Sequence, residues 1–317
     1  MNHDAPGIAF QILQSVFVVL AAPLLMGWVN QCRAWLQNRS APSVWLPYFA
    51  LNKLFHKDAV IARDASPLFR LTPYVLFGCM WLAAGIVPVL ATELPFAPAA
   101  DIIALVGVFA LARVFSALAA MDIGTSFGGL GARREMLIGF LAEPAMLMAM
   151  FTAAFISGST QLTTIVGTLA HREFAIYPSL AFAGLAFLMV LLAENARIPI
   201  DNPTTHLELT MVHEAMILEY SARHLALIEW AVAIKLFAYM TLGFALFVPW
   251  GIARAGDWSA LPVAFAALAA KLALAGAGLA LLETLLAKLR LFLAPEFLSG
   301  AFLLAVLGML IHFLVLG

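Results

Sequence analysis

Charged side chains are scarce in this sequence. Only 11% of its 317 residues are Asp, Glu, Lys or Arg, whereas 64% are hydrophobic. An average soluble domain is about 45–50% apolar and about 25% charged. A soluble globule of this composition could not cover itself with polar surface. The composition therefore excludes that class and predicts an all-α, polytopic integral membrane protein.

Cysteine is also scarce, and there is no excess of basic residues. The two cysteines, Cys32 and Cys79, lie far apart in the sequence. Structural zinc sites and iron–sulfur clusters usually need about four protein ligands, so these two thiols cannot hold either. A disulfide between them stays open. The net charge of −1 gives no support for a nucleic-acid partner.

Long apolar runs are abundant. A membrane-spanning helix needs about 20 mostly apolar residues, and eight stretches approach or exceed that length: about 8–29, 71–91, 101–121, 136–157, 177–193, 224–250, 260–282 and 296–316. The first has no basic segment before it and no small-residue cleavage site after it, so we interpret it as a retained span. No repeat or linker divides the chain, which predicts one integral domain over 1–317.

Lys and Arg are distributed unevenly among the connecting segments. Twelve of the 17 lie in the odd-numbered connections, and only Arg172 and Arg254 lie in the even-numbered ones. Cytoplasmic loops of membrane proteins carry the excess of Lys and Arg. Both termini are therefore expected outside, with the odd-numbered connections in the cytoplasm.

The segment 42–57, "PSVWLPYFALNKLFHK", is too polar to span a membrane. Its large apolar residues alternate with Asn, Lys and His, which predicts a short amphipathic helix at the membrane interface. An ordinary juxtamembrane loop with a basic end is the alternative.

Several charged residues fall inside the predicted spans. Glu229 and Glu283 lie near the cytoplasmic ends of theirs, and four others lie deeper: Arg113, Glu143, Lys235 and Lys271. A charge in the bilayer interior costs several kcal/mol unless it is paired or hydrated. Mixed signs on several helices predict a polar chain through the bundle, with a proton or ion path as the functional interpretation. Structural ion pairs between helices, and snorkelling near the ends, are the alternatives.

Five acids gather in "ENARIPIDNPTTHLELTMVHEAMILEY", which follows the fifth span: Glu194, Asp201, Glu208, Glu214 and Glu219. Pro199 and Pro203 prevent the preceding helix from continuing. Asn202 is a good N-cap and Pro203 a good first residue, so a helix from about Pro203 to about Ser221 is expected, as a cytoplasmic or re-entrant segment.

The composition of that segment favours partial burial. Apolar residues cover much of the predicted helix, and desolvation raises carboxylate pKa values toward the range where protons exchange at neutral pH. A solvated helix with ordinary acids is the alternative. His206 and His213 suit packing or proton transfer better than metal binding, because the second His of a zinc-protease motif is missing.

Four stretches resemble a known family: Ala112 to Pro144, "AENARIPID" from Ala193, Leu218 to Lys235, and "LETLLAKLRL" from Leu282. Over nearly the whole chain the sequence resembles subunit 1 of respiratory NADH dehydrogenase (complex I). It resembles even more the corresponding membrane subunit of formate hydrogenlyase and other energy-converting nickel–iron hydrogenases.

The resemblance implies a membrane subunit that anchors a peripheral redox module and bridges it to antiporter-like subunits. By motif position, Glu143, Glu194, Asp201, Glu208 and Glu219 match acidic positions of the family, and Arg113, Lys235 and Lys271 match basic ones. Together with Glu214 and Glu283 they form the expected proton or ion path. Docking of peripheral subunits is expected on basic side chains: Arg33, Arg39, Arg133, Arg134 and Arg197.

No catalytic residue, cofactor or metal is assigned to this chain itself. The nickel–iron centre and iron–sulfur clusters are expected in partner chains: the hydrogenase large and small subunits and an iron–sulfur subunit. Antiporter-like subunits and lipid complete the expected partners, in a prokaryotic cytoplasmic membrane.

The family's Pro-Phe-Asp motif is Pro199-Ile200-Asp201 here, and Thr204 and His206 replace two expected acids. These changes fall at the family's quinone chamber and favour the hydrogenase branch. A quinone-chamber subunit of a complex I-like oxidoreductase is the alternative, and a stand-alone ion transporter is a further one.

Overall fold

Long helices dominate the computed structural model, which describes residues 4–92, 95, 97–171, 178–201, 211–254, 257–287, 289 and 293–316. Seven helices in these ranges are long and apolar enough to cross a membrane. They are α1 (Asp4–Leu36), α3 (Pro67–Ile86), α4 (Ile102–Asp122), α5 (Ser126–Ser157), α9 (Ala222–Phe247), α10 (Leu261–Leu285) and α11 (Ala294–Leu316).

The remaining predicted span corresponds to α7 (Pro178–Glu194), which has 17 residues. At 1.5 Å per residue it extends about 26 Å, slightly less than the ~30 Å of a hydrocarbon core. All eight predicted stretches thus coincide with helices, and the predicted all-α membrane architecture is confirmed.

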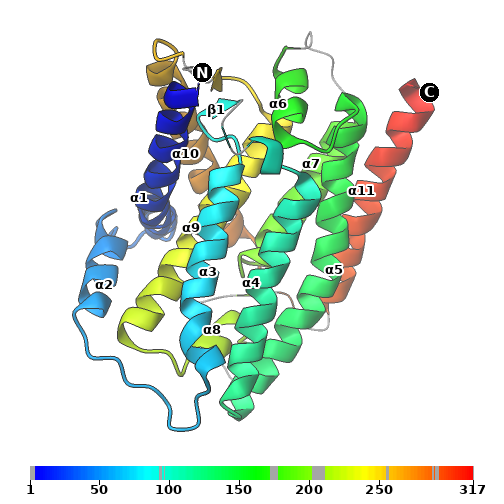
Figure 1. Ribbon diagram of the computed structural model, residues 1–317. Coiled ribbons are helices and arrows are strands. Elements are labelled where there is room, and N and C mark those ends of the chain that lie inside the picture. Colours follow the sequence, from blue (N-terminus) through cyan, green and yellow to red (C-terminus); the bar gives the residue numbers. More distant parts are fainter. Residues whose placement is uncertain are drawn as a thin grey trace.

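Shorter elements lie at the two ends of the bundle (Figure 1). The end where α1 begins and α11 finishes carries α6 (Leu162–His171), the 3-10 helix η1 (Ala97–Ala99) and a pair of parallel strands. These are β1 (Ala91–Thr92) and β2 (Ala253–Arg254), with Ala91 opposite Ala253. Near the opposite end lie α8 (His213–Ile217), the turn between α4 and α5 and the loop before α3. The described parts of the first, third and fifth connections named here thus lie toward one end, and its cytoplasmic orientation stays a prediction.

Capping side chains set where the helices begin. The hydroxyl of Ser66 accepts a hydrogen bond from Leu68 N at the start of α3, and the Asp101 carboxylate accepts one from Ile103 N at the start of α4. Thr125 caps α5 in the same way through Gly128 N. Each cap satisfies an amide that the first helical turn leaves without a partner.

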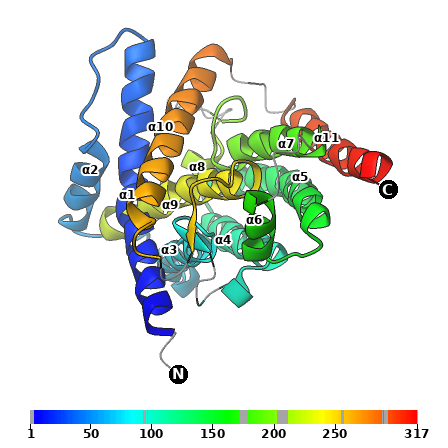
Figure 2. The same ribbon diagram turned by 90° about the horizontal axis from the view of Figure 1, so that it is seen from above.

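Helix packing depends on close approaches at small residues. The helix pairs include α1 with α10, α3 with α4 and α9, and α11 with α5 and α7. A Cβ at Gly276 would lie 2.7 Å from Cδ1 of Trp28, and one at Gly308 would lie 2.8 Å from Ser179 O. Figure 2 shows α1 and α10 side by side at one edge and α11 with α7 at another. The bundle centre between them holds the charged side chains considered below.

A helix, α2 (Leu46–Phe55), occupies the segment predicted to be amphipathic. Phe49 is 65% exposed and Trp45 is 58% exposed, so one side of this helix presents large apolar groups outward. Its position at a membrane interface stays a prediction.

The predicted helix from about Pro203 to about Ser221 is confirmed only over α8 in the part that the structure describes, and it is wrong for residues 218–221. Its first half, including Glu208, lies outside the described residues. The helix α8 ends at Ile217, and tertiary contacts then hold the chain out of a helix. The Tyr220 ring stacks on Phe69 with centroids 3.9 Å apart, its hydroxyl donates to Phe69 O, and Ser221 exchanges two hydrogen bonds with Val60.

Replacing Tyr220 with Ala is expected to destabilise this connection, because it removes both the stack on Phe69 and the bond to Phe69 O. Loss of a buried aromatic side chain costs about 3–5 kcal/mol, so a clear drop in the melting temperature of the detergent-purified protein is expected. Tyr74 is 48% exposed, and Tyr74→Ala is the matched control. An equal effect of the two substitutions would contradict the role given to Tyr220.

Candidate functional site in the bundle interior

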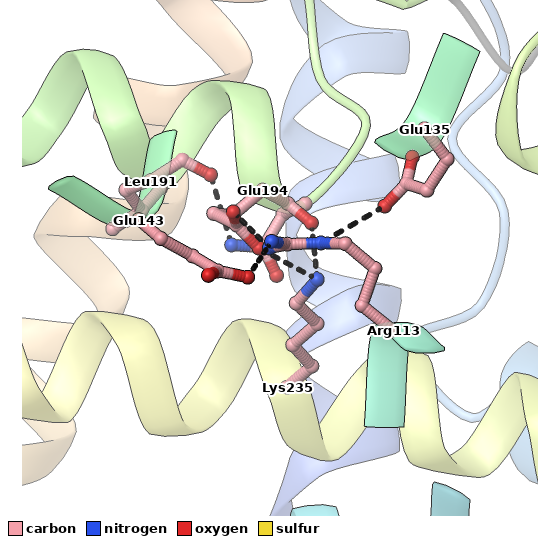
Figure 3. A network of polar contacts seen from close by, with 7 residues as sticks. Arg113, Glu135, Glu143, Leu191, Glu194 and Lys235 are labelled. Atoms are coloured by element: carbon pink, nitrogen blue, oxygen red, sulfur yellow. Dashed lines mark hydrogen bonds and ion pairs between the residues drawn. The ribbon is translucent and has the colours of Figure 1, made fainter. Parts of the chain in front are cut away.

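A network of charged side chains joins four helices in the interior (Figure 3). The guanidinium of Arg113 on α4 donates through Nη1 to Glu143 on α5 and through Nη2 to Glu194, the last residue of α7. Lys235 on α9 lies 3.1 Å from the Glu194 carboxylate and donates to its backbone carbonyl at 2.6 Å. Glu135 on α5 completes the set, 3.7 Å from Nε of Arg113. We call these five residues the central cluster.

Burial makes these ion pairs obligatory. The side chains of Arg113 and Glu194 are only 4% and 1% exposed, whereas that of Glu143 is 32% exposed. Removing one partner of a buried pair leaves an uncompensated charge and typically costs about 3–5 kcal/mol. The central cluster has three carboxylates and two cations, so it carries one surplus negative charge when all are ionised. It therefore has the capacity to accept one proton or another cation.

The local sequence of α5 makes room for Arg113. Glu135, Gly139 and Glu143 are spaced four residues apart and share one helix face. A Cβ on Gly139 would lie 2.6 Å from Cδ of Arg113 and closer still to Nη1. The absence of a side chain at Gly139 lets the guanidinium lie against α5 between the two carboxylates. Glu135 was not among the predicted path residues, and its eight-residue spacing from Glu143 is the signal that could have found it.

A second buried group lies next to the first. Glu283 on α10 is 3.0 Å from Arg197 and 3.5 Å from Arg33 on α1, and Arg197 also donates to the sulfur of Met26. Arg197 is 5% exposed, so it does not present a surface for docking as expected. Arg197 lies in a tight turn after α7, in which its backbone N–H donates to Leu192 O at 2.9 Å. In this turn the Arg197 side chain points inward, toward Glu283.

The same turn connects the two groups. Glu194 belongs to the central cluster and Arg197, three residues later, belongs to the Glu283 group. Ala196 between them has a φ of +49°, which lets the chain reverse within a few residues. A displacement of this turn would therefore change the ion pairs of both groups at once.

The other predicted path residues lie apart from the central cluster. Asp201 is buried and accepts a hydrogen bond from His213 N at 3.3 Å. Glu214 is half-buried and Glu219 is exposed. Lys271 on α10 donates at 2.6 Å to Val248 O in the loop after α9, and also to Trp250 O.

The basic residues predicted for docking differ in exposure. Arg39 and Arg133 are exposed, and Arg33 is partly so. Arg134 instead donates to Met211 O at 2.7 Å, where it fixes the chain that precedes α8.

Three comparisons place the chain among known proteins. A family model described as NADH dehydrogenase matches residues 9–314. Formate hydrogenlyase subunit 4 of Escherichia coli (strain K12) is 31% identical over 289 residues, which is 91% of this chain and 93% of that protein. Hydrogenase-4 component C of the same organism is 34% identical over 248 residues, covering 78% of this chain and 77% of that protein.

A solved structure has the same fold. It is a chain of the membrane-bound sulfane sulfur reductase, an archaeal respiratory membrane complex, and it superposes with a TM-score of 0.80 over 96% of this chain and 98% of that chain. The two chains are 18% identical, so this likeness concerns the fold alone. The sequence relatives confirm the family resemblance.

Substituting Gly139 with Ala tests the close crossing at Arg113. Ala is normally about 1 kcal/mol better than Gly inside a helix, but here the added methyl group would displace the buried guanidinium. A lower melting temperature of the detergent-purified protein is expected. Gly107→Ala on α4 is the control, because a Cβ there meets nothing within 4 Å, and it should leave stability unchanged or raise it. Stabilisation by Gly139→Ala would contradict the packing described.

Proposed function

The chain belongs to the NADH dehydrogenase family, and we propose that it is the membrane-anchoring and coupling subunit of a complex I-like, energy-converting nickel–iron hydrogenase. It docks the peripheral redox module and relays the redox energy to proton or sodium translocation. Identities of 31–34% to a formate hydrogenlyase subunit and a hydrogenase-4 component support the hydrogenase branch. The observation that carries the coupling role is the central cluster, which joins four helices through buried ion pairs.

The proposed coupling depends on the fact that the cations and carboxylates of the central cluster can pair in more than one way. Arg113 and Lys235 both bind Glu194, and Arg113 also binds Glu143. If Glu194 moves with the turn that follows it, the cations redistribute among the carboxylates. The carboxylate that loses its cation then binds a proton more tightly, because a nearby positive charge favours the ionised form. A small movement of the backbone thus becomes uptake or release of an ion.

The turn after α7 is well placed to receive such a signal. It begins one of the basic connections, and in two others Arg39 and Arg133 are exposed. A redox module that docks on these connections would reach the buried segment 195–201 through the connection that this segment begins. The catalytic metals belong to that module, because this chain contains only two cysteines.

A quinone-chamber role is the second candidate, and one cavity favours it. An apolar cavity of about 550 Å³ lies between α1, α9 and α10, with Phe17, Trp28, Phe237 and Phe265 on its walls. Its size suits a small organic molecule. The indole N–H of Trp28 already donates to Ala273 O, so it does not offer a free donor to a quinone carbonyl. Photolabelling of these helices by a quinone probe would support this candidate.

A stand-alone ion transporter was the further alternative, and no contact or cavity in the described residues favours it specifically.

The hydrogenase assignment predicts the composition of the native complex. Gentle purification through an affinity tag on this chain should bring down nickel and iron in stoichiometric amounts and an activity that evolves hydrogen. Metal analysis and a hydrogen electrode provide the readouts. A stable multi-subunit complex without nickel would contradict the assignment.

Glu194→Gln should uncouple the complex, because Gln preserves the shape of Glu194 but removes its charge and its capacity to exchange a proton. In membrane vesicles, the ions translocated per hydrogen evolved are expected to fall by about tenfold or more. Glu296→Gln is the control, because Glu296 on α11 is exposed and belongs neither to the central cluster nor to the predicted path. An unchanged ion ratio in Glu194→Gln would reject the role of this residue.

A further inference from the structure

A small cavity adjoins the central cluster on the side of α8. Its volume is about 50 Å³, and it lies between α3, α4, α5, α8 and α9. Arg113, Ser116, Glu135, Lys235 and His213 contribute polar side chains to its wall. A water molecule needs about 10–15 Å³ of such space and two or more polar partners, so this cavity suits bound water.

Two buried polar atoms of its lining residues point to that use. Nε of Arg113 and Nε2 of His213 have no hydrogen-bond partner within the described ranges. The Glu135 carboxylate is 3.7 Å from Nε of Arg113, too far for a direct bond but suited to a bridging water. Because an unsatisfied buried group is unfavourable, water bonded to these atoms would stabilise the site.

The backbone holds His213 firmly at this cavity. Its amide donates to the Asp201 carboxylate at 3.3 Å. A Cβ on Gly131 of α5 would lie 2.9 Å from Val212 O, so α8 packs directly on α5. These contacts fix the first residue of α8 beside the helix that carries Glu135.

Charged groups face His213 from α4, α5 and α9, whereas α3 contributes only Leu76 and Met80 to the cavity. Glu135 on α5 and Arg113 on α4 share the cavity with it, as does Lys235 on α9. Glu229 on α9 interacts electrostatically with both His213 and Glu214, and it is exposed. Asp201 is bonded to the His213 amide. His213 therefore has Glu214 and Glu229 on one side and the buried cluster on the other.

We propose that His213, together with water in this cavity, passes protons between the acids Glu214 and Glu229 and the central cluster. The proposal rests on the proposed coupling function and names the entrance to its proton path. In the inward direction, one ring nitrogen of His213 receives a proton while the other releases one to the cavity water. The water then protonates Glu135, so one proton moves and the imidazole ends neutral.

The first test is His213→Gln in the intact complex in membrane vesicles. Gln retains hydrogen bonding but cannot relay a proton. The protons translocated per hydrogen evolved should fall by about tenfold or more. His224→Gln is the control, because His224 is a buried histidine on α9 that contacts Tyr74 and not the cavity. An unchanged ratio in His213→Gln, or sodium as the only ion moved, would overturn the proposal.

Chemical rescue separates proton transfer from a structural role. In His213→Ala, added imidazole should restore proton translocation, whereas pyrazole, of similar size but far weaker basicity, should not. Equal rescue by both molecules would show a space-filling role and overturn the proposal.

A second variant covers the case in which His213 variants do not assemble. Ser116→Leu on α4 fills the cavity and excludes water but leaves every titratable group in place, so it should reduce the ratio as much as His213→Gln. Retained translocation in Ser116→Leu together with loss in Glu194→Gln would reject the entrance and leave the coupling function standing. Retained translocation in all of these variants would reject both.

Discussion

The two ion pairs by which Arg113 bridges Glu143 and Glu194 are the interaction on which the interior of this protein depends. One guanidinium joins α4 to α5 through Glu143 and to the end of α7 through Glu194, and Lys235 adds α9 through the same Glu194. A planar guanidinium suits this task, because its donors diverge in a fixed fork. In an apolar bundle each of these charges requires the others, so four helices are held in one relative arrangement.

That dependence also makes the site responsive. A cluster with three carboxylates and two cations has more than one way to pair its charges, and the segment that carries Glu194 continues into the turn that carries Arg197. Arg197 and Arg33 hold Glu283 on α10, so the turn links the α1–α10 edge of the bundle to its centre. Interiors are packed too tightly to deform smoothly. Movement at this turn would therefore be transmitted as a change of ion pairs.

The fold of this chain also occurs in a protein of low sequence identity. The chain shares its fold with a subunit of an archaeal sulfane sulfur reductase, and its sequence is closer to hydrogenase subunits. At 18% identity the likeness to that structure concerns the fold alone. The polar cavity at α8 adjoins the central cluster, and Arg113 and His213 both contribute to its wall.

The length of the apolar stretches and the scarcity of charge predicted much of the fold from the sequence alone. The eight helical stretches, α2 and the mid-span charges Arg113, Glu143 and Lys235 followed from runs of about 20 apolar residues and from the rarity of charge within them. The sequence could not decide which charges meet, because ion pairs between residues such as Arg113 and Glu194 depend on how helices pack. Tertiary structure turned Arg197 inward, directed Lys271 to backbone carbonyls and brought in Glu135. It also ended α8 at Ile217, three residues before Tyr220 stacks on Phe69.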